Sequence, residues 1–131
     1  MHLRFELDFL PIDVSSKAAT VKMRERIRTA IASQCEPAVW EKPVTVEIDA
    51  WHRRAFDLDN VAKQILDSMI RPLSVRDGST LTAYAGLPDD DVRYVTAVYV
   101  RGGLDAFTKV RVRVFPTHFE ETLRLDDPHL K

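Results

Sequence analysis

Two kinds of hydrophobic spacing alternate along the 131 residues of this chain, and their order constrains the fold more than any other feature. Apolar residues at every second position are typical of half-buried strands, and they occur in residues 3–9, 44–51 and 109–114. Apolar residues at helical spacing follow Lys17 and run again through residues 59–70. The chain therefore alternates between predicted strands and predicted helices.

A fourth segment, residues 92–100, differs because it is apolar at nearly every position. Such a segment suits a central strand that is covered on both faces. Gly102 and Gly103 follow it and predict a turn, so segments 92–100 and 109–114 should form an antiparallel hairpin. The sequence predicts one α+β domain over residues 1–131, with a mixed β-sheet and two helices in the order β-α-β-α-β-β.

The composition fits a folded, single-domain protein. With 45% hydrophobic and 30% charged residues, the chain has enough apolar material for one core and enough charge for its surface. Cys35 is the only cysteine, which excludes an intrachain disulfide and favours a reducing, cytoplasmic location. No apolar run is long enough to span a membrane. Residues 73–88 are predicted to form a long loop and residues 120–131 a loose, acidic tail.

Basic residues are clustered although the formal net charge is only −1. They gather in the first predicted helix, before the second predicted helix, and in the last predicted strand. Because proteins bind nucleic acid through local positive patches, these clusters supply candidates for phosphate contacts. The candidates are Arg24, Arg28, Arg53, Arg54, Arg111 and Arg113. Taken singly, each of these arginines is more often a solvated surface residue.

The most informative segment is Asp57-Leu58-Asp59-Asn60, at the start of the second predicted helix. Two carboxylates that are one residue apart point the same way if the backbone is extended. Mg²⁺ prefers carboxylate oxygens and keeps several waters, so two or three carboxylates and a substrate phosphate suffice to bind it. Lys63 lies one helical turn beyond Asp59 and can reach back toward this pair, where its ammonium could bind a phosphate.

A third carboxylate is expected from the run Asp89-Asp90-Asp91, at the entrance to the predicted strand over residues 92–100. A short displacement in space would bring this run beside the first pair. Clustered acids repel one another, and a bound cation removes that repulsion. The run therefore supplies the remaining ligand of a predicted magnesium site.

Each of these groups also has an ordinary structural role. Asp57 or Asp59 alone is more often a helix cap that complements the helix dipole. The run of three aspartates alone is more often a solvated turn. Lys63 alone is more often an exposed partner of Asp59 or Asp67. The combination of all three features in one small domain favours the metal site.

This combination resembles the signature of the RusA family of Holliday-junction resolvases. In that family an Asp-Leu-Asp-Asn motif precedes a lysine three residues beyond the asparagine, and an Asp-Asp pair later opens a strand. Here the motif is Asp57-Leu58-Asp59-Asn60 with Lys63, then Asp90-Asp91 followed by Val-Arg-Tyr-Val, and the similarity covers residues 53–114. The interval from Lys63 to Asp91 is longer than in the family, which implies an insertion within residues 73–88. The family's Pro- and Asn-rich N-terminal segment is absent.

The resemblance implies a homodimeric, Mg²⁺-dependent endonuclease of bacterial or phage origin, with Mn²⁺ able to replace Mg²⁺. Such an enzyme makes paired nicks in four-way DNA junctions during recombination and repair. Carried over to this chain, the metal ligands would be Asp57, Asp59 and Asp91, with Asp90 as the alternative to Asp91. Asn60 and Lys63 would support the site.

Two other functions stay open. Residues 57–61 also fit the Asp-x-Asp-x-Val pattern of haloacid-dehalogenase-type phosphatases, in which the first aspartate is a nucleophile. The residues before Asp57 are only partly strand-like and the chain is short for that doubly wound fold, which ranks this function lower. The other function is a branched-DNA-binding module with an inactive acid cluster. It would bind junctions without Mg²⁺-dependent nicking.

Overall fold

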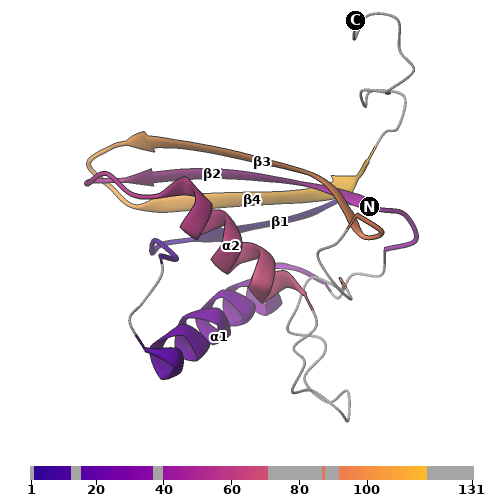
Figure 1. The fold of residues 1–131 in the computed structure, drawn as a ribbon, viewed down its shortest axis with the longest axis horizontal. Coiled ribbons are helices and arrows are strands. Elements are labelled where there is room, and N and C mark those ends of the chain that lie inside the picture. The colour runs from indigo at the N-terminus through magenta and orange to yellow at the C-terminus, as the bar shows by residue number, and fades with distance from the viewer. Residues whose placement is uncertain (1, 13–15, 37–39, 71–86, 88–91, 118–131) are drawn as a thin grey trace, which may run out of the picture.

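The computed structural model describes residues 2–12, 16–36, 40–70, 87 and 92–117. The predicted loop over residues 73–88, apart from Leu87, and the predicted tail over residues 120–131 lie outside these ranges. The elements, in chain order, are β1 (Leu3–Leu7), α1 (Lys17–Gln34), β2 (Val44–His52), α2 (Leu58–Met69), β3 (Val95–Leu104) and β4 (Lys109–Pro116). Both helices lie on one face of a single four-stranded sheet (Figure 1). The predicted α+β class and element order are confirmed.

The sheet has the strand order β1-β4-β2-β3 and is mixed. β2 and β3 are parallel and are joined through α2, because a parallel pair needs a crossover connection. β4 runs antiparallel to β1 on one side and to β2 on the other. The predicted hairpin between residues 92–100 and 109–114 is therefore wrong, since β2 lies between β3 and β4.

β3 is an edge strand, which corrects the prediction that residues 92–100 form a central strand covered on both faces. The strand begins at Val95, and two of its apolar side chains, Val98 and Tyr99, are exposed. A continuous apolar run is expected for burial on both faces, but among the described residues only one edge of this strand is paired. The apolar character of β3 thus needs another explanation.

The boundaries of two strands also differ from prediction. Gly102 and Gly103 lie within β3, so the predicted turn at this glycine pair is wrong, and residues 105–108 make the connection to β4. Glycine is needed at position 102 because the start of α2 packs closely against the strand there, and not because the chain turns. β1 ends at Leu7, two residues before the predicted end.

One continuous core fills the space between the sheet and the helices. Alternate side chains of β1, β2 and β4 point into it and are almost fully buried, among them Phe5, Leu7, Val46, Ile48, Val112 and Val114. α2 contributes Val61, Ile65 and Met69, which recur at helical spacing. Full burial of a side chain of this size stabilises a fold by about 1.5–3 kcal/mol. The core therefore holds α2 firmly on the sheet.

α1 packs beside α2 and against β1 (Figure 1). It begins at Lys17, as predicted, because the Ser16 hydroxyl accepts a hydrogen bond from the backbone N–H of Ala19 at 3.1 Å. Ile27 and Ile31 are its buried positions. Neither described helix combines the length and the apolar composition that a membrane-spanning helix needs.

The thiol of Cys35, the C-cap residue of α1, is half-buried and donates a hydrogen bond to the Arg4 carbonyl at 3.0 Å. Burial raises the pKa of this thiol above its ordinary value. Because the thiolate is the reactive form, we expect native Cys35 to react with iodoacetamide at mildly alkaline pH several-fold more slowly than in urea-unfolded protein. Mass spectrometry of quenched samples measures both rates. Equal rates in the two states would contradict the protection.

Candidate functional site

The acid pair lies where β2 leads into α2. Asp57 is the N-cap of the helix: its backbone is extended, and its carboxylate accepts a hydrogen bond from the backbone N–H of Asp59 at 2.9 Å. Asp59 is exposed in the first turn, and among the described residues its carboxylate has no hydrogen-bond or ion-pair partner. Asp57 therefore has the capping role, while its second oxygen and both oxygens of Asp59 remain available to a ligand.

A close contact seats the start of α2 on β3. Gly102 pairs with Ala50 in the sheet, and Ala50 is buried on the face that carries the helices. A Cβ atom on Gly102 would lie 2.6 Å from Cδ2 of Leu58 and 3.1 Å from Cζ of Phe56. Because glycine has no side chain, the Asp57–Asp59 segment can approach the strand this closely.

The end of β2 is held by the connection between β3 and β4. The His52 Nδ1 atom and the Thr108 hydroxyl are hydrogen-bonded at 2.7 Å, and the Asp105 backbone N–H donates to the His52 carbonyl at 2.9 Å. The His52 ring also packs edge-on against Phe56. These contacts fix the backbone that leads to the acid pair.

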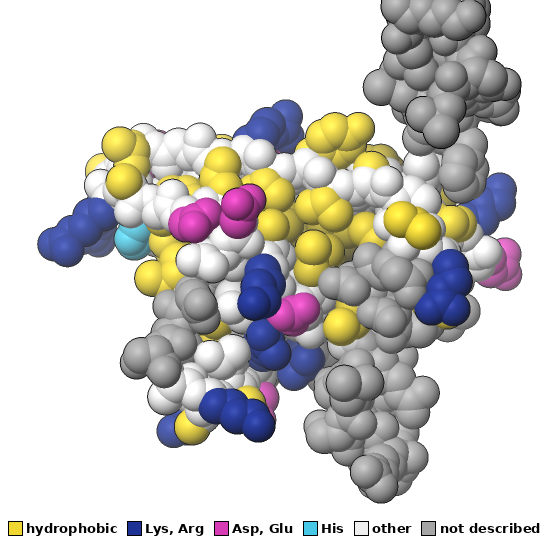
Figure 2. Space-filling view, viewed as in Figure 1, with side chains coloured by type: hydrophobic (Ala, Val, Ile, Leu, Met, Phe, Trp, Pro, Cys, Tyr) yellow, Lys and Arg dark blue, Asp and Glu magenta, His cyan; other side chains and the backbone are white. Residues whose placement is uncertain are grey.

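Lys63 and Asn60 lie next to the acid pair on the first turns of α2. Lys63 is exposed and makes no ion pair with any described residue. Its alternative partner, Asp67, is bonded to Arg24 at 2.9 Å instead. Asn60 is half-buried. Figure 2 shows acidic side chains near the start of α2 and basic side chains farther along it. Because Lys63 is exposed and lies one helical turn beyond Asp59, its ammonium is available to an anion.

Arg53 and Arg54 are the predicted phosphate contacts closest to the acid pair in the chain. Both follow β2 directly and are exposed, and neither has an ion-pair partner within the described ranges. Figure 2 shows basic side chains projecting at the end of the molecule where β2 leads into α2. Their guanidinium groups are therefore available to phosphates near the acid pair.

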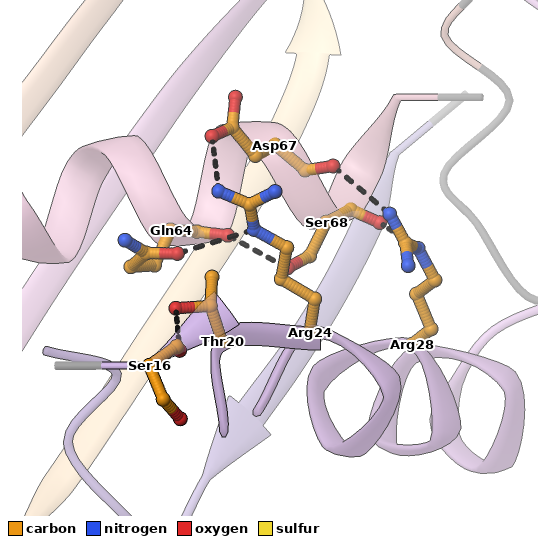
Figure 3. Close-up of polar contacts among 7 residues, drawn as sticks. All are labelled: Ser16, Thr20, Arg24, Arg28, Gln64, Asp67 and Ser68. Atoms are coloured by element: carbon orange, nitrogen blue, oxygen red, sulfur yellow. Dashed lines mark hydrogen bonds and ion pairs between the residues drawn. The ribbon is translucent and has the colours of Figure 1, made fainter. Parts of the chain in front are cut away.

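Arg24 and Arg28 join α1 to α2 (Figure 3). Arg24 donates hydrogen bonds to the Asp67 carboxylate at 2.9 Å and to Oε1 of the buried Gln64 at 3.2 Å. Arg28 donates hydrogen bonds to the backbone carbonyls of Asp67 and Ser68 at 3.1 and 3.2 Å. These carbonyls lie in the last turn of α2, where the helix itself provides no N–H partner. Both arginines thus have partners within the protein, and their predicted contact with DNA is not needed to explain them.

Arg111 and Arg113 lie on the sheet face that carries no helix, because the residues that alternate with them on β4 are buried beneath the helices. Arg111 pairs with Glu6 at 3.2 Å, and Arg113 pairs with Glu47. The structure therefore separates these two arginines from the acid pair, which lies at the start of α2 on the helix-bearing side of the sheet.

The third predicted carboxylate, from Asp90 or Asp91, lies outside the described residues. Leu87, which precedes both in the chain, forms an isolated bridge with Ile70 at the end of α2 opposite to the acid pair. Within the described ranges, no three His, Cys, Asp or Glu side chains are grouped as metal ligands would be. The described part of the site therefore contributes two carboxylates.

Two buried polar residues of α2 belong to the contacts that join α2 to α1, and they were not predicted. Gln64 and Ser68 are 1% and 0% exposed, and the Ser68 hydroxyl donates to the Gln64 carbonyl at 2.7 Å. Gln64 in turn accepts the hydrogen bond from Arg24. Their position in the same helical stripe as Val61 and Ile65 is a usable signal, because a polar residue on a core face needs a partner.

Comparison with known protein families finds no family model that matches the chain, and no characterised protein is significantly similar to it. The resemblance to the RusA signature is therefore a resemblance of motif and spacing.

Proposed function

We propose that this protein is a divalent-metal-dependent endonuclease that acts on branched DNA, with its active site at the start of α2. The observation that carries the proposal is the placement of Asp57, Asp59 and Lys63 on the first turns of one helix, where Asp59 and Lys63 have no ion-pair partner among the described residues. A cation site next to a phosphate-binding ammonium suits phosphodiester hydrolysis. The RusA resemblance adds the four-way junction as substrate.

The donor set fits Mg²⁺. Asp59 offers both carboxylate oxygens, and Asp57 offers the oxygen that does not cap the helix. Proteins commonly hold Mg²⁺ by one or two carboxylates, with waters and substrate phosphate oxygens completing the shell. When bound here, Mg²⁺, or Mn²⁺ in its place, would activate a water and polarise the phosphate. Asp91, or Asp90, is proposed as the third ligand; because β3 begins beside Val44, at the end of β2 remote from Asp57, this ligand would come from a second copy of the chain.

The protein's own residues position the DNA. The Lys63 ammonium binds a non-bridging oxygen of the scissile phosphate and offsets the negative charge that develops there. Arg53 and Arg54 hold adjacent backbone phosphates, which gives affinity without sequence preference. Asn60 supports the site from the first turn of α2. A homodimer would present two such sites with the twofold symmetry of a four-way junction.

The test compares the wild type with Asp59→Asn on a four-way junction and on linear duplex, each with and without Mg²⁺. We expect paired, symmetric nicks only in the junction, only with Mg²⁺ and only with the wild type, because Asp59 supplies a metal ligand. Asp67→Asn is the matched control on the same helix: this carboxylate already pairs with Arg24, so its loss should leave nicking intact. Equal nicking by the wild type and Asp59→Asn would sink the proposal.

A junction-binding module without catalysis is the second candidate. It is favoured by the capping role of Asp57, which gives one member of the acid pair a structural purpose. Electrophoretic mobility of the same junction separates the two functions. If the wild type and Asp59→Asn shift it equally and neither nicks it with Mg²⁺ or Mn²⁺, the protein is a binding module.

A further inference from the structure

The two edge strands of the sheet, β1 and β3, differ in how their outer backbone groups are hydrogen-bonded. At the β1 edge, the Gln34 side chain bonds both backbone groups of Glu6, at 2.7 and 2.8 Å, and Cys35 bonds the Arg4 carbonyl. The end of α1 thus occupies the outer hydrogen-bonding groups of β1. At the other edge, β3 extends over ten residues beside β2 alone, and no described residue bonds the outer backbone of β3.

The β3 edge is also the most apolar exposed part of the described surface. Of the seven exposed large hydrophobic side chains there, five lie on β3 or next to it: Val92, Val98, Tyr99, Leu104 and Phe107. Leu104 is 69% exposed and Tyr99 is 59% exposed. Sheet proteins protect free edges with lysine, proline or bulges. β3 contains no lysine or proline, and its one register irregularity, at Thr96, lies at the start of the strand, so the edge from Ala97 to Leu104 is open to pairing with another strand.

α2 extends this apolar surface beyond the strand. Leu58, Ala62 and Leu66 recur at four-residue spacing along α2 and are only half-buried. Leu58 faces Gly102 of β3, which places this stripe on the β3 side of the helix. Figure 2 shows hydrophobic side chains gathered along the boundary between β3 and α2. The exposed apolar surface is therefore continuous from strand to helix.

We propose that this surface, the β3 edge together with Leu58, Ala62 and Leu66, is the interface of a twofold dimer in which β3 pairs antiparallel with β3 of a second copy. Charge favours a second copy over DNA as the occupant. Arg101 is the one charged residue within β3, and it is already bonded to Asp49 at 2.7 Å. The edge is therefore neutral and self-complementary. Strand and helix stripe together bury more area than a strand alone, as a stable interface requires.

The dimer joins two four-stranded sheets into one continuous sheet, with the helices of both copies on the same face. Because the two β3 strands run in opposite directions, the two acid pairs lie toward opposite ends of the paired strands. The start of β3 in one copy then lies beside the end of β3 in the other. This inference names the surface for the homodimer of the proposed function, but it depends on packing alone and not on nuclease activity.

Sedimentation velocity at micromolar concentration tests the interface. We expect the molar mass of the wild type in solution to be twice the 15.0 kDa of one chain. Val98→Lys places an ammonium within the apolar edge and should weaken dimerisation about 30-fold or more. Val21→Lys is the matched control because Val21 is a similarly exposed valine, 46% compared with 38% for Val98, but it lies on α1. This control should dimerise like the wild type.

Leu104→Lys is the second variant if circular dichroism shows that Val98→Lys does not fold. Leu104 is so exposed that its replacement leaves the core intact. A monomeric wild type, or lysine variants that dimerise as tightly as the wild type, would overturn the interface. The two proposals can fail separately. If Leu104→Lys loses the dimer while Asp59→Asn still nicks the junction like the wild type, the interface is supported and the proposed function fails.

Discussion

Asp57→Asn is expected to reduce Mg²⁺-dependent nicking about 100-fold or more without unfolding the protein. Asparagine caps helices as well as aspartate does, so its side-chain oxygen can keep the hydrogen bond from the Asp59 backbone N–H. The neutral amide is a poor ligand for Mg²⁺, so the substitution should lower the nicking rate and not the stability of the fold. Single-turnover nicking of a junction measures the rate, and urea unfolding should show a free-energy change of no more than about 0.5 kcal/mol.

Asp57→Ala separates the cap from the carboxylate charge. It removes both, so it should lose the same activity and also about 1 kcal/mol of the free energy of unfolding. Comparison of the two variants assigns each effect to one function of the side chain. An Asp57→Asn protein that nicks at the wild-type rate would show that Asp57 is only a cap, and would leave the metal to other carboxylates.

Gly102→Val is expected to lower the free energy of unfolding by about 2 kcal/mol and to reduce nicking by the protein that remains folded. The added Cβ would lie 2.6 Å from Leu58 and 3.1 Å from Phe56. The end of the Leu58 side chain can move aside, but the two valine methyl groups need space that Phe56 also fills. The start of α2 must therefore shift, and the acid pair shifts with it. Urea unfolding and a nicking rate normalised to folded protein measure the two effects.

The neighbouring glycine provides the control for this prediction. A Cβ on Gly103 would lie 3.5 Å from Cδ1 of Trp51, which is an ordinary contact. Valine also suits a strand better than glycine does, so Gly103→Val should be neutral or stabilising by about 0.5 kcal/mol. Unfolding midpoints that are the same for both valine variants would mean that Gly102 does not seat the helix.

Local periodicity is sufficient to predict the fold class and the element order, because each period is set by a few consecutive residues. It does not determine which strands pair. Leu3 pairs with Val114, and Val44 pairs with Val95, and nothing in either local segment identifies its partner. The apolar run in β3 has the same pattern as a central strand, and under the proposed dimer a second copy supplies the missing neighbour.

The site is predictable where its members are close in sequence. Asp57, Asp59 and Lys63 lie within one capped helical start, so the motif alone places them together. The arginines were less predictable, because each depends on a partner in a distant element. Arg24 reaches α2 from α1, and Arg113 reaches β2 from β4. A basic cluster in sequence does not show whether its charges are already paired.

The position of β4 in the sheet has a consequence for biosynthesis. β4 is the last described strand along the chain, yet it lies between β1 and β2 and hydrogen-bonds to both. During translation β1 therefore emerges early and has no strand partner until nearly all of the described chain has been made. Pairing over such long sequence separations is slow, because loop entropy is lost before contacts form. The nascent chain consequently carries β1 without its strand partner until β4 has been made.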